Sequence, residues 1–267
     1  MSSFAIASRS NSIRESAKNM KAMILAAGLG TRLRPLTGDR PKALVEINGR
    51  TLLEIALSRL RNSGVCEVIV NVHHFAGLIE DYLKTHDNFG MTIELSREDV
   101  LLDTGGGLKK AAHFFAGNSI HPEEPFIVHN VDVLSTIDLW RMVQFHKDNQ
   151  ALATLAVQQR ATSRYLLFDN QLQLCGRRIG DLEPEVARVS EQTHALAFSG
   201  IHVISPRLLA MMSEDGAFSI IATYLRLAAQ GEKILAFRAD EYYWRDLGTP
   251  ESLTQAALDL QQNVIAQ

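Results

Sequence analysis

Residues 21–30 read KAMILAAGLG, an apolar run that ends in glycines. Such a run predicts a strand that is buried on both faces, which is typical of a parallel sheet. A loop at the carboxyl end of such a strand is where α/β proteins bind ligands, and glycines let backbone N–H groups approach a polyphosphate. We therefore expect a nucleotide to bind at this loop.

Strand and helix patterns alternate through the rest of the first half. Strand-like runs occur near 68–72, 91–95 and 126–129, and helical patterns occupy 51–63, 75–84 and the segment after Gly107. This alternation predicts an α/β fold, a Rossmann-like, mostly parallel sheet flanked by helices with right-handed crossovers.

The second half has a different pattern, because its first strand-like segments follow one another without long helices. These segments are 151–157, 165–168 and 172–175. They predict an antiparallel elaboration of the sheet, and a helix at 218–230, a strand at 234–237 and a helix after Pro250 complete the chain. We expect residues 1–20 to form a disordered N-terminal extension and residues 21–267 to form one domain.

Composition excludes several classes of protein. The 267 residues are 46% hydrophobic with a net charge of −3, which excludes a disordered chain and a basic surface for nucleic acid. Apolar runs fall short of the roughly 20 residues of a membrane helix. Two cysteines give no disulfide framework, so we expect buried or inert thiols and a cytoplasmic location.

The loop after the first strand carries further motif residues. Residues 28–37 read GLGTRLRPLT, and residues 40–44 read RPKAL. The dinucleotide fingerprint would need a third glycine where Leu33 stands, and the chain has no Gly-Lys pair for a P-loop. Taken alone, the loop is equally compatible with a tight turn that carries solvated arginines.

The loop is accompanied by four other motifs: DTGGG at 103–107, NVD at 130–132, FSGI at 198–201 and WRDLGT at 244–249. Together they resemble the sugar-1-phosphate nucleotidyltransferases, also called nucleotide-sugar pyrophosphorylases, from Lys21 to the C-terminus. In detail the chain is similar to short bacterial members that act as mannose-1-phosphate guanylyltransferases or N-acetylmuramate-1-phosphate uridylyltransferases. The resemblance implies that a nucleoside triphosphate and a sugar 1-phosphate react to an NDP-sugar and pyrophosphate.

The resemblance also implies roles for charged residues. A sugar phosphate is largely dianionic at pH 7, so catalysis needs positioning and charge neutralisation rather than a general base. Arg32, Lys42 and Asp132 match the catalytic positions, and Asp132 and Asp246 match the ligands of Mg²⁺. For each aspartate, capping of a helix is the alternative role.

Nucleotide and sugar contacts follow from the same motifs. His73 and His74 are adjacent, point to opposite faces and lack a third ligand, so we reject a metal site there. The Glu-Lys pair that many relatives use for the sugar is absent, although Arg160 and Arg164 lie in that region. The expected nucleotide-binding residues are Ala26, Ala27, Gly28, Gly30, Thr31, Arg32, Asn71, Thr104, Gly105 and Gly106, and the expected sugar-binding residues are Ser199 and Gly200.

Two other classes of function stay open at this point. A glycosyltransferase of a related fold would need an Asp-x-Asp metal motif, and residues 129–132 read HNVD instead. A catalytically silent nucleotide-sugar-binding regulatory protein is the second alternative. The sequence does not specify the sugar, the nucleobase or the oligomeric state.

Overall fold

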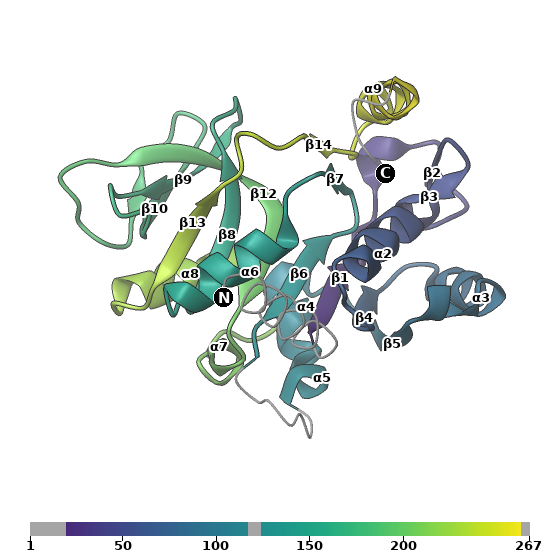
Figure 1. The fold of residues 1–267 in the computed structure, drawn as a ribbon, viewed down its shortest axis with the longest axis horizontal. Helices are drawn as coiled ribbons and strands as arrows, with labels where there is room; N and C mark the ends of the chain where they lie inside the picture. The colour runs from purple at the N-terminus through teal and green to yellow at the C-terminus, as the bar shows by residue number, and fades with distance from the viewer. Residues whose placement is uncertain (1–19, 117–123, 263–267) are drawn as a thin grey trace, which may run out of the picture.

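The computed structural model describes residues 20–116 and 124–262, and Figure 1 shows their arrangement. Residues 1–19 of the expected extension lie outside the described residues. Met20, its last residue, is buried against the core with 4% of its surface exposed. The packed part of the chain therefore includes one residue that the sequence pattern assigned to the extension.

Four parallel strands form the centre of the fold, as their apolar runs predicted. They are β1 (Lys21–Leu25), β4 (Glu67–Val72), β5 (Thr92–Arg97) and β6 (Phe126–Asn130). Their order in the sheet is β6-β1-β4-β5, with parallel pairing throughout. Neighbouring residues of β1 pack into different hydrophobic clusters on the two faces, so the strand is buried on both sides. The predicted fold class is confirmed.

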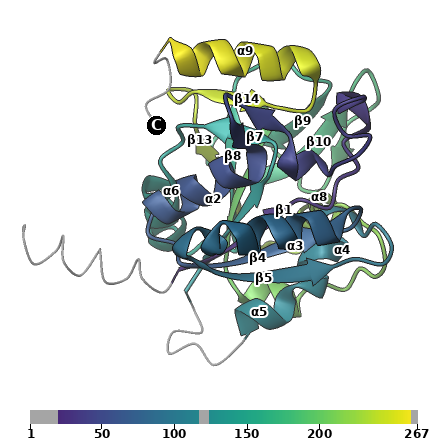
Figure 2. The same ribbon diagram turned by 90° about the vertical axis from the view of Figure 1, so that its right-hand side faces the viewer.

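Helices cover both faces of the sheet (Figures 1 and 2). One hydrophobic cluster includes α2 (Leu52–Asn62), α3 (Ala76–Thr85) and α6 (Leu139–Asp148). The other cluster includes α4 (Asp103–Lys110), α5 (Ala112–Ala116), α7 (Arg207–Ala210) and α8 (Ile220–Ala229). Side-chain oxygens of Thr51, Asp138 and Ser219 accept N–H bonds from the first turns of α2, α6 and α8 and fix where these helices begin.

The second half of the chain extends the sheet beyond β6. In the described ranges this sheet has ten strands, and β12 (His194–Ile204) pairs antiparallel with β6. The other added strands are β8 (Ala153–Gln158), β9 (Arg164–Phe168), β10 (Leu174–Ile179), β11 (Glu185–Val186) and β13 (Ile234–Arg238). Most of these pairings are antiparallel, as expected, but β13 pairs parallel with β8.

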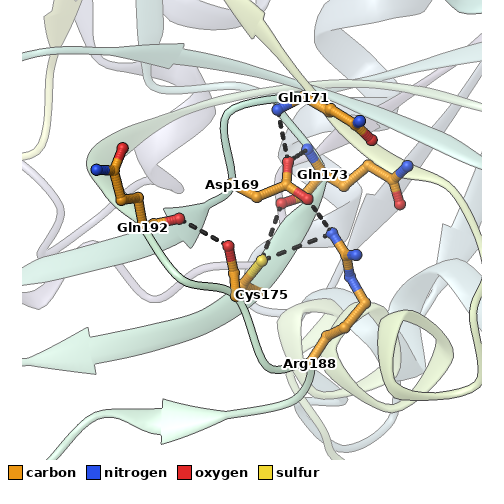
Figure 3. Close-up of polar contacts among 7 residues, drawn as sticks. Asp169, Gln171, Gln173, Cys175, Arg188 and Gln192 are labelled. Atoms are coloured by element: carbon orange, nitrogen blue, oxygen red, sulfur yellow. Dashed lines mark hydrogen bonds and ion pairs between the residues drawn. The ribbon is translucent and has the colours of Figure 1, made fainter.

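A polar cluster holds the far part of this extension together (Figure 3). Asp169 Oδ1 accepts hydrogen bonds from two backbone N–H groups of the turn between β9 and β10, both at 2.9 Å. Its Oδ2 pairs with Arg188, whose Nη2 lies 3.6 Å from Sγ of Cys175. Burial raises the pKa of the Cys175 thiol, which keeps it protonated. The other cysteine, Cys66, is exposed.

Two small sheets complete the fold. One joins β2 (Glu46–Ile47) to β3 (Arg50–Thr51), and the other joins β7 (Val133–Ser135) to β14 (Trp244–Asp246). The helix α9 (Pro250–Gln261) follows β14, and short 3₁₀ helices lie at Thr31–Leu33, Lys42–Leu44 and Asp87–Gly90. In the part of the chain that the structure describes, no helix has the length and apolar character to cross a membrane.

Candidate active site

A cleft opens at the carboxyl ends of β1, β4 and β6, where Leu25, Asn71 and Asn130 reach it. Its volume of ≈ 450 Å³ is in the range of small-molecule sites. Many residues that the sequence predicted line it together: Ala27, Gly28, Gly30, Thr31, Arg32, Lys42, Asn71, Thr104 and Asp132. The loop after β1 and the strand ends therefore form one site, as the topology required.

The loop after β1 is fixed by its own contacts. Gly30 has φ +62°, and a Cβ there would lie 3.0 Å from both Lys42 Cβ and Thr37 Cγ2. The Thr37 hydroxyl donates to the Gly30 carbonyl at 2.9 Å, and Leu33 is fully buried beneath the loop. Gly28 has open space around its Cα, with no atom within 4 Å of an added Cβ. A ligand can thus approach the backbone at Gly28, whereas Gly30 is required for packing.

Lys42 pairs with Asp132 at this cleft. Lys42 Nζ donates to Asp132 Oδ2, and only 10% and 19% of the two side chains are exposed. Pro41 holds the extended backbone from which the short helix of Lys42 begins. Two residues that the resemblance named as catalytic are therefore in direct contact, although 90 positions separate them.

Arg32 faces Asp246 in a second, more open pair. Arg32 Nη2 lies 3.9 Å from Asp246 Oδ1, and 65% and 43% of the side chains are exposed. The backbone N–H of Gly248 donates to the same carboxylate oxygen at 2.7 Å. A Cβ at Gly248 would lie 2.5 Å from both groups, so the glycine makes room for this contact. An exposed pair of this kind leaves both partners available to a ligand.

The backbones of the two aspartates are adjacent because β7 pairs with β14. Asp246 lies opposite Val133, and the N–H of Leu247 donates to the Asp132 carbonyl at 2.8 Å. The sequence predicted a common role for these aspartates but not the small sheet that brings them together.

Asn71 supports the loop through both ends of its amide. Its Oδ1 accepts the N–H of Ala26 at 2.7 Å, and its Nδ2 donates to Glu98 Oε1 at 2.7 Å. Glu98 Oε2 accepts the N–H of Leu102 at 3.0 Å, and both polar side chains are buried. Sequence reasoning missed Glu98, because a single glutamate after a strand belongs to no motif. Asn71 lines the cleft but already has a partner at each end of its amide, and a contact with the nucleobase stays a prediction.

The glycines at 105–107 lie inside α4, so this helix begins earlier than the helical segment that the sequence predicted after Gly107. A Cβ at Gly105 would lie 2.3 Å from the ring of Phe218, and a Cβ at Gly106 would lie 2.3 Å from the Gly216 carbonyl oxygen. These two glycines therefore let α4 pack against residues 216–218. Their expected contact with the nucleotide stays a prediction.

Thr104 lies at the rim of the cleft, beside the first turn of α4. Its hydroxyl accepts the N–H of Ile220 at 3.0 Å, which ties α4 to α8. Leu101 and Ala217 line the same side of the cleft. These side chains make this part of the cleft lining apolar.

Ser199 and Gly200, the expected sugar-binding residues, pack among neighbouring strands. Ser199 has 0% of its surface exposed, and its carbonyl accepts Nε1 of Trp244 at 2.8 Å. Gly200 has φ +72°, and a Cβ there would lie 2.8 Å from Asn130 Nδ2 and 2.9 Å from Val133 Cγ2. The two residues thus pack against the strands beside the cleft, and their contact with a sugar stays a prediction.

Two buried histidines lie on the strands behind the site. Burial lowers the pKa of His129 to about 4, and burial with the nearby His129 lowers the pKa of His202 to about 3. His129 Nδ1 is hydrogen-bonded to the Asn130 carbonyl, and His202 Nδ1 to the Tyr224 hydroxyl at 2.8 Å. Both imidazoles are therefore neutral at pH 7.

The carboxylates of Asp132 and Asp246 are oxygen donors of the kind that a divalent cation takes as ligands. Within residues 20–116 and 124–262, no group of three or more His, Cys, Asp or Glu side chains has metal-binding geometry. Mg²⁺ needs only one or two protein carboxylates, because phosphate oxygens and water complete its shell. His73 is hydrogen-bonded to the Glu98 carbonyl, and His74 is exposed.

Comparisons with known proteins agree with this geometry. A family model described as nucleotidyl transferase matches residues 21–263. The chain is 34% identical over 239 residues to the N-acetylmuramate alpha-1-phosphate uridylyltransferase of Caulobacter vibrioides, and the match covers 86% of this chain and 93% of the relative. It is 28% identical over 247 residues to the mannose-1-phosphate guanylyltransferase of Mycobacterium tuberculosis, covering 91% of this chain and 65% of the relative. A solved UDP-glucose pyrophosphorylase with bound UDP-glucose shares the fold, with a TM-score of 0.72, 20% identity and coverage of 91% and 98%.

The chain therefore belongs to the nucleotidyl transferase family. It is an enzyme of the sugar-1-phosphate nucleotidyltransferase class, which confirms the resemblance that its motifs carried.

Proposed function

We propose that this enzyme makes its NDP-sugar by transferring a nucleoside monophosphate unit from a nucleoside triphosphate to a sugar 1-phosphate, with Arg32, Lys42 and Asp132 as catalytic residues. The observation that carries the proposal is the meeting of two cation–carboxylate pairs at one cleft, Lys42 with Asp132 and Arg32 with Asp246. Each pair joins residues that are distant in the chain.

The reaction makes one bond and breaks one. An oxygen of the sugar 1-phosphate attacks the α-phosphorus of the triphosphate, and the bond from that phosphorus to the bridging oxygen breaks as pyrophosphate leaves. The attacking phosphate has a second pKa near 6 and is largely deprotonated at pH 7. The protein therefore has to align the two substrates and neutralise the charge that develops.

Lys42 and Arg32 supply positive charge at different depths of the cleft. The buried Lys42 ammonium meets phosphate oxygens at the reacting phosphorus, where few water molecules compete with it. The more exposed Arg32 offers a planar fork that suits the departing phosphates. Backbone N–H groups of the 28–31 loop bind the remaining phosphate oxygens.

Mg²⁺ is the cofactor that we propose, with Asp132 and Asp246 as its protein ligands. When bound, the ion supplies Lewis-acid neutralisation of phosphate charge. Lys42 and Arg32 keep the two carboxylates oriented toward the cleft before substrates arrive.

The relatives suggest which substrates to test first. We propose UTP with N-acetylmuramate 1-phosphate as the first pair, because the relative at 34% identity and 93% coverage carries that name. GTP with mannose 1-phosphate is the second pair, after the other relative. Two free cysteines are consistent with a cytoplasmic location, which we also propose.

A substrate matrix tests the proposal. Purified protein with Mg²⁺ is incubated with each of UTP, GTP, dTTP and CTP against a set of sugar 1-phosphates, and pyrophosphate release is measured. We expect release with at least one pair, and its loss on Lys42→Ala. Binding of an NDP-sugar without release from any pair would instead favour the silent regulatory protein.

A further inference from the structure

Arg160 carries a positive charge that the roles above do not use. It lies between β8 and β9, with its guanidinium carbon 3.7 Å from the ring centroid of Trp244. Its Nη2 donates to the Phe198 carbonyl at 2.7 Å, and Trp244 itself is held by the Ser199 carbonyl. The carbonyls of Phe198 and Ser199, at an irregular part of β12, therefore hold both the guanidinium and the indole on which it stacks.

This charge has no carboxylate partner in the described ranges. None of the ion pairs there, at N···O distances up to 4.0 Å, involves Arg160, and its buried Nε has no hydrogen-bond partner. Burial lowers the pKa of the Arg160 guanidinium, and Asp246 opposes that effect. A partly buried guanidinium that contacts no carboxylate directly has lost hydration, and an anionic ligand bound to it would offset that cost.

The position of Arg160 distinguishes it from the cations that meet the triphosphate. Figure 1 shows β14 between the antiparallel strands and the half of the sheet around β1. Arg32 and Lys42 approach the aspartates from the β1 half, whereas Arg160 stacks on β14 from the antiparallel half. Arg160 therefore reaches β14 from a different segment of the chain than the two cations assigned to the triphosphate.

We propose that Arg160 binds an anionic oxygen group of the sugar substrate, either its 1-phosphate or a carboxylate on the sugar. The inference rests on the proposed function and identifies a specificity residue for it. A guanidinium stacked on an indole presents its N–H groups in one plane, and that arrangement matches the two oxygens of a phosphate or carboxylate. Lysine at this position would keep the charge but lose the planar fork.

Three variants test the proposal: Arg160→Met, Arg160→Lys and the control Arg178→Met. Arg178 is an exposed arginine of β10 that lies over Tyr165 at 5.1 Å, so the control also removes an arginine from an aromatic ring. We expect Arg160→Met to raise KM for the sugar 1-phosphate roughly tenfold or more, with KM for the triphosphate within about twofold of wild type. Arg160→Lys should be intermediate, and Arg178→Met should match wild type.

Comparing two sugar 1-phosphates shows which anionic group of the sugar substrate Arg160 binds. If KM rises for both mannose 1-phosphate and N-acetylmuramate 1-phosphate, Arg160 binds the 1-phosphate, and a rise for the acidic sugar alone assigns it to the carboxylate. If Arg160→Met leaves KM unchanged for both sugar 1-phosphates, the proposal is overturned. It is also overturned if the variant raises KM equally for the triphosphate and the sugar 1-phosphate and lowers the melting temperature. All of these outcomes require that the wild-type enzyme releases pyrophosphate with at least one substrate pair. If the wild type releases none with any pair, the proposed function itself is overturned. If Arg160→Met does not fold, Arg160→Lys carries the same test, because it keeps the charge.

Discussion

Replacing Lys42 by Met should weaken both the fold and the reaction. The substitution keeps the length of the side chain but removes the ammonium group from Asp132, a carboxylate with only 19% of its surface exposed. Breaking a fully buried ion pair costs about 3–5 kcal/mol. Because this pair borders an open cleft, where water can reach the carboxylate, we expect a loss of about 2 kcal/mol in the free energy of unfolding.

That loss should be visible as a fall in melting temperature of about 4–8 °C for a chain of this size. The double variant Lys42→Met/Asp132→Asn has neither charge, so its loss should be smaller than the sum of the two single losses by about 1–2 kcal/mol. Urea unfolding without ligands measures the three losses. Lys84→Met is the control, because it breaks an exposed pair with Glu80 and should leave the midpoint unchanged.

The same variants should lose turnover for a different reason. An ammonium group that meets developing charge contributes about 10²–10³-fold to kcat, so Lys42→Met should lower turnover by that factor and affect triphosphate binding much less. Strictly additive stability losses, or normal turnover in Lys42→Met, would refute the reasoning about this pair.

Two further predictions concern packing and pH. Gly105→Ala should lower the melting temperature, because its Cβ would lie 2.3 Å from the Phe218 ring. Gly28→Ala should leave the melting temperature unchanged and raise KM for the triphosphate, because an added Cβ meets no protein atom within 4 Å. Equal losses of melting temperature in the two variants would contradict the assignment of Gly105 to packing and of Gly28 to ligand contact. The pKa values of His129 and His202, about 4 and about 3, lie below the unfolded value, so the unfolded chain binds more protons in acid. The free energy of unfolding should be highest above roughly pH 6.5 and should fall toward pH 4 by up to about 1.4 kcal/mol per pH unit for each histidine. Unfolding experiments at several pH values measure this slope, and His202→Gln should reduce it. A slope that His202→Gln leaves unaltered would contradict the assignment.

The parallel half of the fold could be predicted from local sequence because burial on both faces leaves continuous apolar runs. The run predicted at 68–72 is β4, and the run at 126–129 forms most of β6. The start of α4 could not be predicted in this way. Its glycines are required by residues 216–218, which are distant in the chain, and helix propensity alone disfavours glycine.

In the candidate site, too, contiguous motifs could be predicted from the sequence and contacts between distant segments could not. The motif around Arg32 and Lys42 was recognisable because its residues are contiguous or nearly so. The stacking of Arg160 on Trp244 and the hydrogen bond from the Asn71 amide to Glu98 depend on contacts between distant segments, and no local sequence pattern predicts them. The burial of Ser199 likewise depends on strand pairing.

The most direct test of the account is whether Asp132 and Asp246 form one magnesium site. Each aspartate is changed to Asn, alone and together, and turnover is measured at several Mg²⁺ concentrations. Each single variant should fold and lose roughly a hundredfold or more in activity, and the double variant should be little worse than either, because the residues act as a unit. Normal turnover in either single variant, or losses that multiply in the double variant, would mean that the two aspartates do not share a metal ion.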